Sequence, residues 1–234
     1  MRLLCGLVVA VLLVTGCSGG DEDVPRESRS AEPDPDRTLS VQEIEDAMLR
    51  PANLSEGFEG AFTEGVETSP AGTFIVAASD ACEDLWGATQ AERYADLDDV
   101  EALFFKTDLG PFLHQHVIAA DEATVTAELD RMATATEACP SYTTEEPDGH
   151  RTAVEFHQTI FPEVGDRSVT IERGITRSDG TNHLFGGSTT VFIAIGPHLM
   201  ILTATHYVDQ EQFATDELEE IVATAIERLE DART

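Results

Sequence analysis

The sequence predicts an α+β domain in which a twisted antiparallel sheet has helices packed on it and one disulfide. Some stretches place apolar residues at every second position, which is typical of strands, and others at spacings of three and four, which is typical of helices. Short turns join the strand-like stretches of the second half into hairpins. An apolar sheet face and an apolar helix stripe bury each other when they pack together.

Two helices are expected in the first 90 residues. The first begins at Ser40, because Ser40 and Glu43 have the spacing of a capping box, and Pro51 stops it. Its apolar stripe consists of Val41, Ile44 and Met48. The second is capped by Ser79-Asp80. One of its faces carries Cys82, Leu85, Trp86 and Thr89.

Two longer helices are expected further along the chain. One runs from Asp121, its cap, to Cys139, which precedes Pro140. Its stripe consists of Val125, Leu129, Met132, Ala133 and Thr136. The last helix runs from about Gln210 to Leu229, with acidic residues opposite its stripe. That stripe consists of Leu218, Ile221, Val222, Ala225, Ile226 and Leu229.

Strands are expected between and after these helices. Residues 57–78 form weak strands, and residues 100–106 and 112–119 form two apolar strands joined by a turn. In the second half, Pro147-Asp148-Gly149 is a hairpin turn, and Gly196-Pro197-His198 joins the apolar strands 191–195 and 199–205. Two further strands carry Val154, Phe156 and Ile160, and Val169, Ile171 and Ile175.

Residues 1–16 are expected to be a lipoprotein signal peptide. Arg2 gives a positive start, and Leu3–Val14 is apolar but too short to span a bilayer. Leu13-Val14-Thr15-Gly16-Cys17 matches the bacterial lipobox, in which small residues precede the cleavage site. Cys17 is therefore the expected lipidation site. Acyl chains such as palmitate on it would anchor the protein to the outer face of the cell membrane.

Residues 17–38 are expected to be a disordered acidic tether, because they are rich in Ser, Gly, Pro, Asp and Glu with almost nothing to bury. The folded domain is then residues 39–234. The net charge of −31 repels nucleic acid and anionic lipid, which excludes both as partners. The acidity fits a saline habitat and an ordinary exported surface equally well.

Cys82 and Cys139 are expected to form a disulfide. Cys5 leaves with the signal peptide and Cys17 is lipidated, so two cysteines of the four remain in an oxidising compartment. The alternative, a redox or metal role, has neither a CxxC motif nor a Cys-His spacing to support it.

Histidines supply the candidate binding residues. His114 and His116 are two positions apart on an expected strand and therefore share a face, while His157 accompanies Glu155 on another polar strand face. One interpretation is a metal site built from His114, His116 and a distant residue. The other is that these side chains only line a groove. No GxSxG, SxxK, P-loop, GxGxxG or HExxH pattern is present, so no catalytic residue is assigned.

Several of these features together resemble one known family. They are Leu39-Ser40 with Ile44, Ser79-Asp80-Ala81-Cys82, the strand Leu113–Ile118 with a central Gln115, and the helix from Asp121 to Cys139. The pattern resembles the extracellular sensor domain of PknH-type mycobacterial kinases and of actinobacterial lipoproteins that carry it. The resemblance implies an α+β domain with a groove between sheet and helices that binds an extracellular ligand. The family's second cysteine pair is missing from Phe185–Tyr207, which leaves open whether the later strands enclose the same groove.

The expected function is that of a membrane-anchored, non-enzymatic envelope lipoprotein with a sensor-like domain. It would bind an unknown small ligand or an envelope protein, without a cofactor. The candidate binding residues are His114, Gln115, His116 and His157. The alternatives are an envelope metal-dependent hydrolase that uses these histidines and a purely structural assembly factor.

Overall fold

The structure is a computed structural model of the 234-residue chain. It describes residues 36–63, 74–75, 79–87, 91–107, 110–145, 147, 149, 151–157, 159, 161–178, 183–207 and 212–234, which belong to one compact unit, Pro33–Thr234. The expected signal peptide, Cys17, most of the tether, Thr89 and Ile160 lie outside these residues, as does the side chain of Trp86. No helix of the described part is long and apolar enough to cross a membrane.

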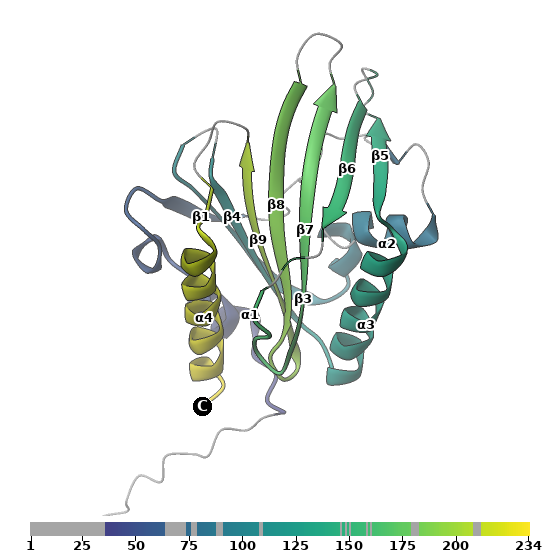
Figure 1. The fold of residues 1–234 in the computed structure, drawn as a ribbon. Coiled ribbons are helices and arrows are strands. Elements are labelled where there is room, and N and C mark those ends of the chain that lie inside the picture. The colour runs from purple at the N-terminus through teal and green to yellow at the C-terminus, as the bar shows by residue number, and fades with distance from the viewer. Residues whose placement is uncertain are drawn as a thin grey trace, which may run out of the picture. The chain divides into compact units, whose positions relative to one another are not determined.

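Within the described residues, nine strands form one antiparallel sheet in the order β1-β3-β4-β9-β8-β7-β6-β5-β2 (Figure 1). The strands are β1 (Glu59–Thr63), β2 (Phe74–Ile75), β3 (Asp98–Phe105), β4 (Phe112–Ala119), β5 (Ser141–Glu145), β6 (Arg151–His157), β7 (Arg167–Ser178), β8 (His183–Ala194) and β9 (His198–Tyr207). The expected hairpins β3–β4, β5–β6 and β8–β9 are all confirmed. The α+β class with an antiparallel sheet is therefore correct.

Helices cover both faces of this sheet (Figure 1). They are α1 (Val41–Ala47), α2 (Asp80–Gly87), α3 (Glu122–Ala138) and α4 (Thr215–Ala232), with short 3-10 turns η1 (Pro51–Asn53) and η2 (Ala91–Tyr94). On what we call the α1–α4 face, α1 and α4 bury Leu113 and Val117 of β4. On what we call the α2–α3 face, α2 and α3 bury Ile118 of β4 and Ile201 of β9. Because successive side chains of a strand point to opposite faces, each strand contributes residues to two separate cores.

The expected helix caps at Ser40 and Asp121 are present. Ser40 and Glu43 form the capping box of α1, and the Asp121 carboxylate accepts a hydrogen bond of 2.8 Å from the Thr124 amide at the start of α3. The C-terminal end of α1 is held by α4, because the Arg228 guanidinium donates to the carbonyls of Ala47 and Met48, both at 3.0 Å. These carbonyls have no partner within their own helix, so the guanidinium satisfies them.

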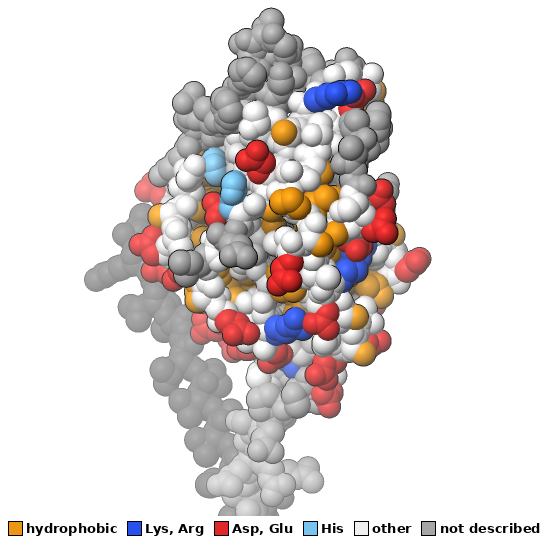
Figure 2. All heavy atoms as spheres, turned by 45° about the vertical axis from the view of Figure 1, so that its right-hand side comes forward, with side chains coloured by type: hydrophobic (Ala, Val, Ile, Leu, Met, Phe, Trp, Pro, Cys, Tyr) orange, Lys and Arg blue, Asp and Glu red, His pale blue; other side chains and the backbone are white. Residues whose placement is uncertain are grey.

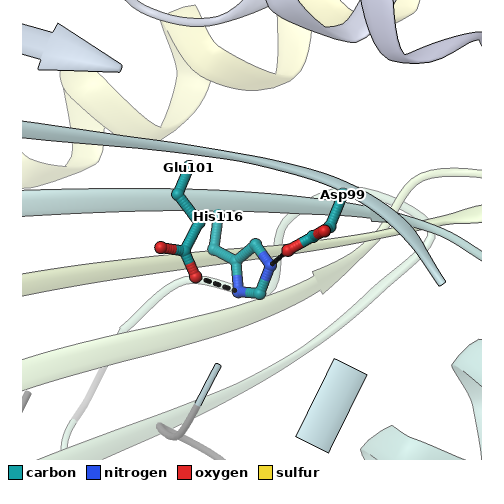
Figure 3. A group of neighbouring side chains, drawn as sticks. All are labelled: Asp99, Glu101 and His116. Carbon is teal, nitrogen blue, oxygen red and sulfur yellow. Dashed lines mark hydrogen bonds and ion pairs between the residues drawn. The ribbon is translucent and has the colours of Figure 1, made fainter. Parts of the chain in front are cut away.

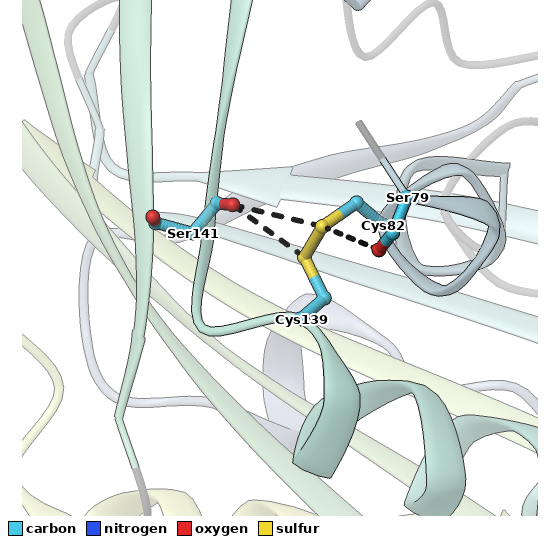
Figure 4. Close-up of a disulfide and its surroundings, with 4 residues drawn as sticks. All are labelled: Ser79, Cys82, Cys139 and Ser141. Carbon is cyan, nitrogen blue, oxygen red and sulfur yellow. Dashed lines mark hydrogen bonds between the residues drawn. A yellow bond between two sulfur atoms is a disulfide. The ribbon is translucent and has the colours of Figure 1, made fainter. Parts of the chain in front are cut away.

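The disulfide joins Cys82 of α2 to Cys139, the residue that caps the end of α3 (Figure 4). Their Cα atoms are 5.1 Å apart, and both residues are buried. The expected pairing is confirmed. It ties α2 to α3 on the α2–α3 face, where both helices pack on the sheet.

Some local expectations were wrong. Val41 is 41% exposed, whereas the other two members of its expected stripe, Ile44 and Met48, are buried. In α3, Ala135 completes the buried stripe and Ala133 does not, since it lies toward the edge of that face. Gly186-Gly187-Ser188-Thr189 lies inside β8 despite its two glycines, and the register there pairs Gly187 with Gly174.

Acidic side chains dominate the described surface on the side turned forward in Figure 2, with few basic ones among them. This agrees with the net charge of −31. The same view shows histidine side chains reaching the surface in one area of this side.

The folded state is expected to lose stability as the pH falls below 6.5, because His198 is fully buried as a neutral side chain. Its Nε2 accepts a hydrogen bond of 3.1 Å from the Leu39 amide, and burial lowers its pKa from 6.5. The unfolded chain therefore binds this proton more readily than the folded one. The stabilisation is complete above pH 6.5 and is lost as the pH falls toward the folded-state pKa, with a slope of at most about 1.4 kcal/mol per unit.

Urea unfolding at intervals between pH 7.5 and 5.5 measures this slope. His198→Gln should remove most of it. His206→Gln serves as the matched control, because burial also lowers the pKa of His206, but that side chain is only half-buried. An unchanged slope in His198→Gln would show that other groups cause the pH dependence.

Candidate functional site

Strands β3 and β4 bring four ionisable side chains together on the α2–α3 face. The register pairs Glu101 with His116 and Leu103 with His114. Asp99 precedes Glu101 by two residues, as His114 precedes His116, so strand alternation places all four on one face. We call Asp99, Glu101, His114 and His116 the polar cluster; Figure 3 shows three of them.

Within the polar cluster, carboxylates and imidazoles alternate. His116 Nε2 lies 2.7 Å from Asp99 Oδ2, and His116 Nδ1 lies 3.5 Å from Glu101 Oε1 (Figure 3). The other oxygen of that carboxylate, Oε2, lies 3.7 Å from His114 Nε2. His116 therefore lies between two carboxylates, and Glu101 lies between two imidazoles.

The polar cluster is buried unevenly. The side chains of Glu101 and His116 are 4% and 5% exposed, whereas that of Asp99 is 32% exposed. Removing a carboxylate from water costs several kcal/mol unless positive charge or hydrogen-bond donors replace the water. The imidazoles of His114 and His116 beside its two oxygens make Glu101 a buried carboxylate with polar neighbours on both sides.

Tyr94 links the polar cluster to a network on α3. Its ring meets the His116 ring edge-on, with centroids 5.5 Å apart, and its hydroxyl donates to Glu128 Oε1 at 2.9 Å. Burial raises the pKa of the Tyr94 hydroxyl, which therefore stays a donor. Burial also raises the pKa of Glu128, although Arg93, with its Nε at 3.1 Å, opposes this.

A cavity of about 250 Å³ lies beside this tyrosine. Its lining is mixed and includes Arg93, Tyr94, Glu128, Val125, Ile118 and Leu199. Tyr94 therefore both lines the cavity and contacts His116 of the polar cluster.

Buried hydroxyl groups continue the polar cluster across the sheet. Thr203 of β9 lies opposite His114, and Thr190 of β8 lies opposite Thr203, with 3.1 Å between the two hydroxyl oxygens. Further along β8, Ser188 accepts a hydrogen bond of 2.7 Å from Arg173 Nε. The α2–α3 face is thus apolar under the helices and polar beyond them.

The four expected binding residues do not all meet. His114 and His116 lie together in the polar cluster. Gln115 faces the α1–α4 core, where it is 1% exposed and its Oε1 accepts a hydrogen bond of 2.9 Å from the Leu49 amide. His157 is exposed on β6, and because Val154 and Phe156 face α3, alternation directs it to the opposite sheet face.

Asp99 and Glu101 were not predicted as site residues from the sequence. Acidic residues are abundant in this chain, with 45 in total, so two on one strand carry little signal. The register of the predicted hairpin could have identified them. Pairing residues 98–105 with 112–119 across the short turn places Glu101 opposite His116.

Donor atoms that suit a metal ion are present in the polar cluster. Asp99, Glu101 and His116 can each direct one ligand atom so that all three lie within 4.8 Å of one another. The metal site considered from the sequence combined His114 and His116 with a distant residue, whereas the structure supplies carboxylates from the adjacent strand.

These features define an α+β domain whose large antiparallel sheet has helices on both faces and a buried polar cluster on one. The fold is that of the extracellular domain of PknH from Mycobacterium tuberculosis, with a TM-score of 0.58, 12% identity, and coverage of 84% of this chain and 99% of that one. An uncharacterized protein of Mycobacterium smegmatis, an Rv0999 ortholog, gives a TM-score of 0.46 at 12% identity, with 82% and 98% covered. No protein-family model and no curated protein matches the chain. The resemblance inferred from the sequence is confirmed at the level of the fold.

Proposed function

We propose that this chain is an exported lipoprotein whose folded domain binds a ligand outside the cytoplasm without catalysing a reaction. The polar cluster is the observation that carries the proposal. Ionisable side chains gather on a sheet face that is apolar where the helices cover it, and buried Glu101 lies between two imidazoles. Buried polar side chains arranged in this way contribute little to stability but provide several directed polar contacts for a ligand.

Two observations support a location of the protein outside the cytoplasm. Leu13–Cys17 has the lipobox pattern. The PknH domain with the same fold is an extracellular one. Neither depends on the other, since one rests on residues before the domain and the other on the domain's fold.

Cys17→Ser is expected to move the protein from the membrane fraction to the soluble fraction. Two acyl chains contribute about 0.8 kcal/mol per buried CH₂, which makes the anchor effectively permanent, and the serine variant has none. Cell fractionation followed by immunoblotting measures this. Ser18→Ala is the matched control and should stay with the membrane. Retention of Cys17→Ser in the membrane fraction would refute lipidation at this residue.

Replacing His114 and His116 together by asparagine is expected to remove a bound ligand while changing the melting temperature by less than about 4 °C. Native mass spectrometry of protein purified from its own host gives the first readout, and thermal unfolding gives the second. A similar loss of stability and of ligand would instead show that the two histidines are structural.

A metal-dependent hydrolase is the second candidate, because the polar cluster offers suitable donors. The depth of these donors favours binding over turnover. Side chains that are 4% and 5% exposed leave little room for a large substrate and an attacking water at the same ion. Hydrolysis that depends on added metal and disappears in Glu101→Gln would favour the enzyme.

A further inference from the structure

We propose that the cavity beside Tyr94 is a second binding site, which takes a small apolar molecule that carries one carboxylate group. The site goes beyond the proposed function, because none of its lining residues belongs to the polar cluster. Its lining consists of Arg93, Tyr94, Leu97, Ile118, Ala120, Thr124, Val125, Glu128 and Leu199. These residues come from η2 and the segment after it, from the ends of β4 and β9, and from the first half of α3.

Apolar side chains form most of this lining. Ile118, Val125 and Leu199 belong to the core that α2 and α3 share with the sheet. Leu97, in contrast, is 37% exposed, and among the described residues only one other large apolar side chain is exposed to a similar degree. A ligand in the cavity would remove part of Leu97 from water, which favours a ligand with an apolar body.

The volume of the cavity limits the size of the ligand. A volume of about 250 Å³ corresponds to about eight water molecules, since each occupies about 30 Å³ in the liquid. This is enough for one six-membered ring with a single substituent, or for a short aliphatic chain. A whole lipid or a folded peptide is too large to enter.

The carboxylate of Glu128 already has its full set of donors. The Tyr94 hydroxyl donates to its Oε1 at 2.9 Å, and Arg131 donates to both oxygens, with Nε 3.1 Å from Oε2. Arg93 Nε lies 3.1 Å from Oε1, and Arg93 Nη2 donates to Oε2 at 3.4 Å. A carboxylate offers about four lone-pair sites, so these contacts fill it. The polar group of a ligand therefore has to be an acceptor rather than a donor.

Arg93 is the lining residue that can bind such an acceptor. Its Nη1 lies 3.9 Å from Asp84 Oδ1, which is too far for a hydrogen bond, so these N–H groups can turn to a ligand. The planar guanidinium matches the two oxygens of a carboxylate, and the opposite charges strengthen the bonds. Glu128 would keep Arg131 and the Tyr94 hydroxyl as donors while Arg93 is shared.

Local charge also permits an anion at this position. The chain has 45 acidic residues and only 14 basic ones, so most of its surface repels anions. Beside the cavity, however, Arg93 and Arg131 together balance Asp84 and Glu128. A carboxylate that enters here meets two guanidinium groups in a neutral surrounding.

Equilibrium dialysis of the full-length chain in detergent against radiolabelled benzoate, with uptake by detergent alone subtracted, tests the proposal. One benzoate per chain is expected at pH 7. Benzamide has the same shape without the charge and should bind at least about 10-fold more weakly, as should benzoate to Arg93→Gln. Ala120→Leu should abolish binding by filling the cavity. Arg151→Gln is the matched control, because Arg151 also pairs with a glutamate, at 2.8 Å, but lies outside the lining.

Thermal unfolding with and without benzoate gives a second readout. Benzoate should raise the melting temperature of the wild type and of Arg151→Gln, but not that of Ala120→Leu. No saturable binding by the wild type, or equal binding by the wild type, Arg93→Gln and Ala120→Leu, would overturn the proposal. Benzamide that binds as tightly as benzoate would overturn the carboxylate. Either failure leaves the polar cluster unaffected, because the double histidine variant tests that site separately.

Discussion

Replacing Cys82 and Cys139 by alanine is expected to lower the free energy of unfolding by about 4 kcal/mol, from the entropy of the 57-residue loop that the disulfide closes. The loop contains α2, β3, β4 and α3, so the unfolded chain gains freedom over the whole segment that builds the polar cluster. Most small domains are stable by only 5–15 kcal/mol, so the loss would be a large share of the total.

Urea unfolding of the double alanine variant and of the reduced wild type measures this effect. The two should agree, because each removes the same cross-link. Ser79→Ala is the control for local disturbance, since Ser79 Oγ lies 3.5 Å from Cys82 Sγ and its loss leaves the disulfide intact (Figure 4). A loss below about 1 kcal/mol in both forms would show that the unfolded chain is already compact in this segment.

Replacing the buried members of the polar cluster by apolar residues is expected to stabilise the fold. In a variant with Glu101→Leu, His114→Leu and His116→Phe, the free energy of unfolding should rise by about 1–4 kcal/mol, because well-packed apolar side chains avoid the desolvation of buried charges. Asp99 can lose its partner without a large penalty, since its side chain is 32% exposed to water.

Urea unfolding measures the change, and Glu101→Ala alone provides the contrast. That single variant should be destabilised, because it leaves a cavity and polar atoms without their partner. A triple variant that is less stable than the wild type by several kcal/mol would show that the polar cluster supports the fold. In that case its contribution to stability would account for the polar cluster without a bound ligand.

Much of the fold follows from local signals that the sequence displays. The capping box at Ser40 and the cap at Asp121 locate two helices, and the turns at 107–111 and 196–198 locate two hairpins. The order of strands in the sheet does not follow from such signals. β9 inserts between β4 and β8, which are far from each other along the chain, and only long-range packing decides this.

The candidate site was predicted only in part, for a related reason. Spacing of two residues correctly placed His114 and His116 on one face, and the same alternation directs Gln115 to the opposite face, where it is buried in the α1–α4 core. The partners Asp99 and Glu101 depend on the register of β3 against β4, and no property of an individual aspartate or glutamate reveals that. His157 looked similar to His116 in sequence, but its side chain is exposed on the opposite face of the sheet.

The most direct test is a crystal structure of the protein purified from its own host, with electron density examined at the polar cluster. We expect density for a bound species between Glu101 and His116 that also contacts His114 Nε2. A ligand bound elsewhere, with these side chains contacting only one another, would contradict the assignment of this face as the binding site.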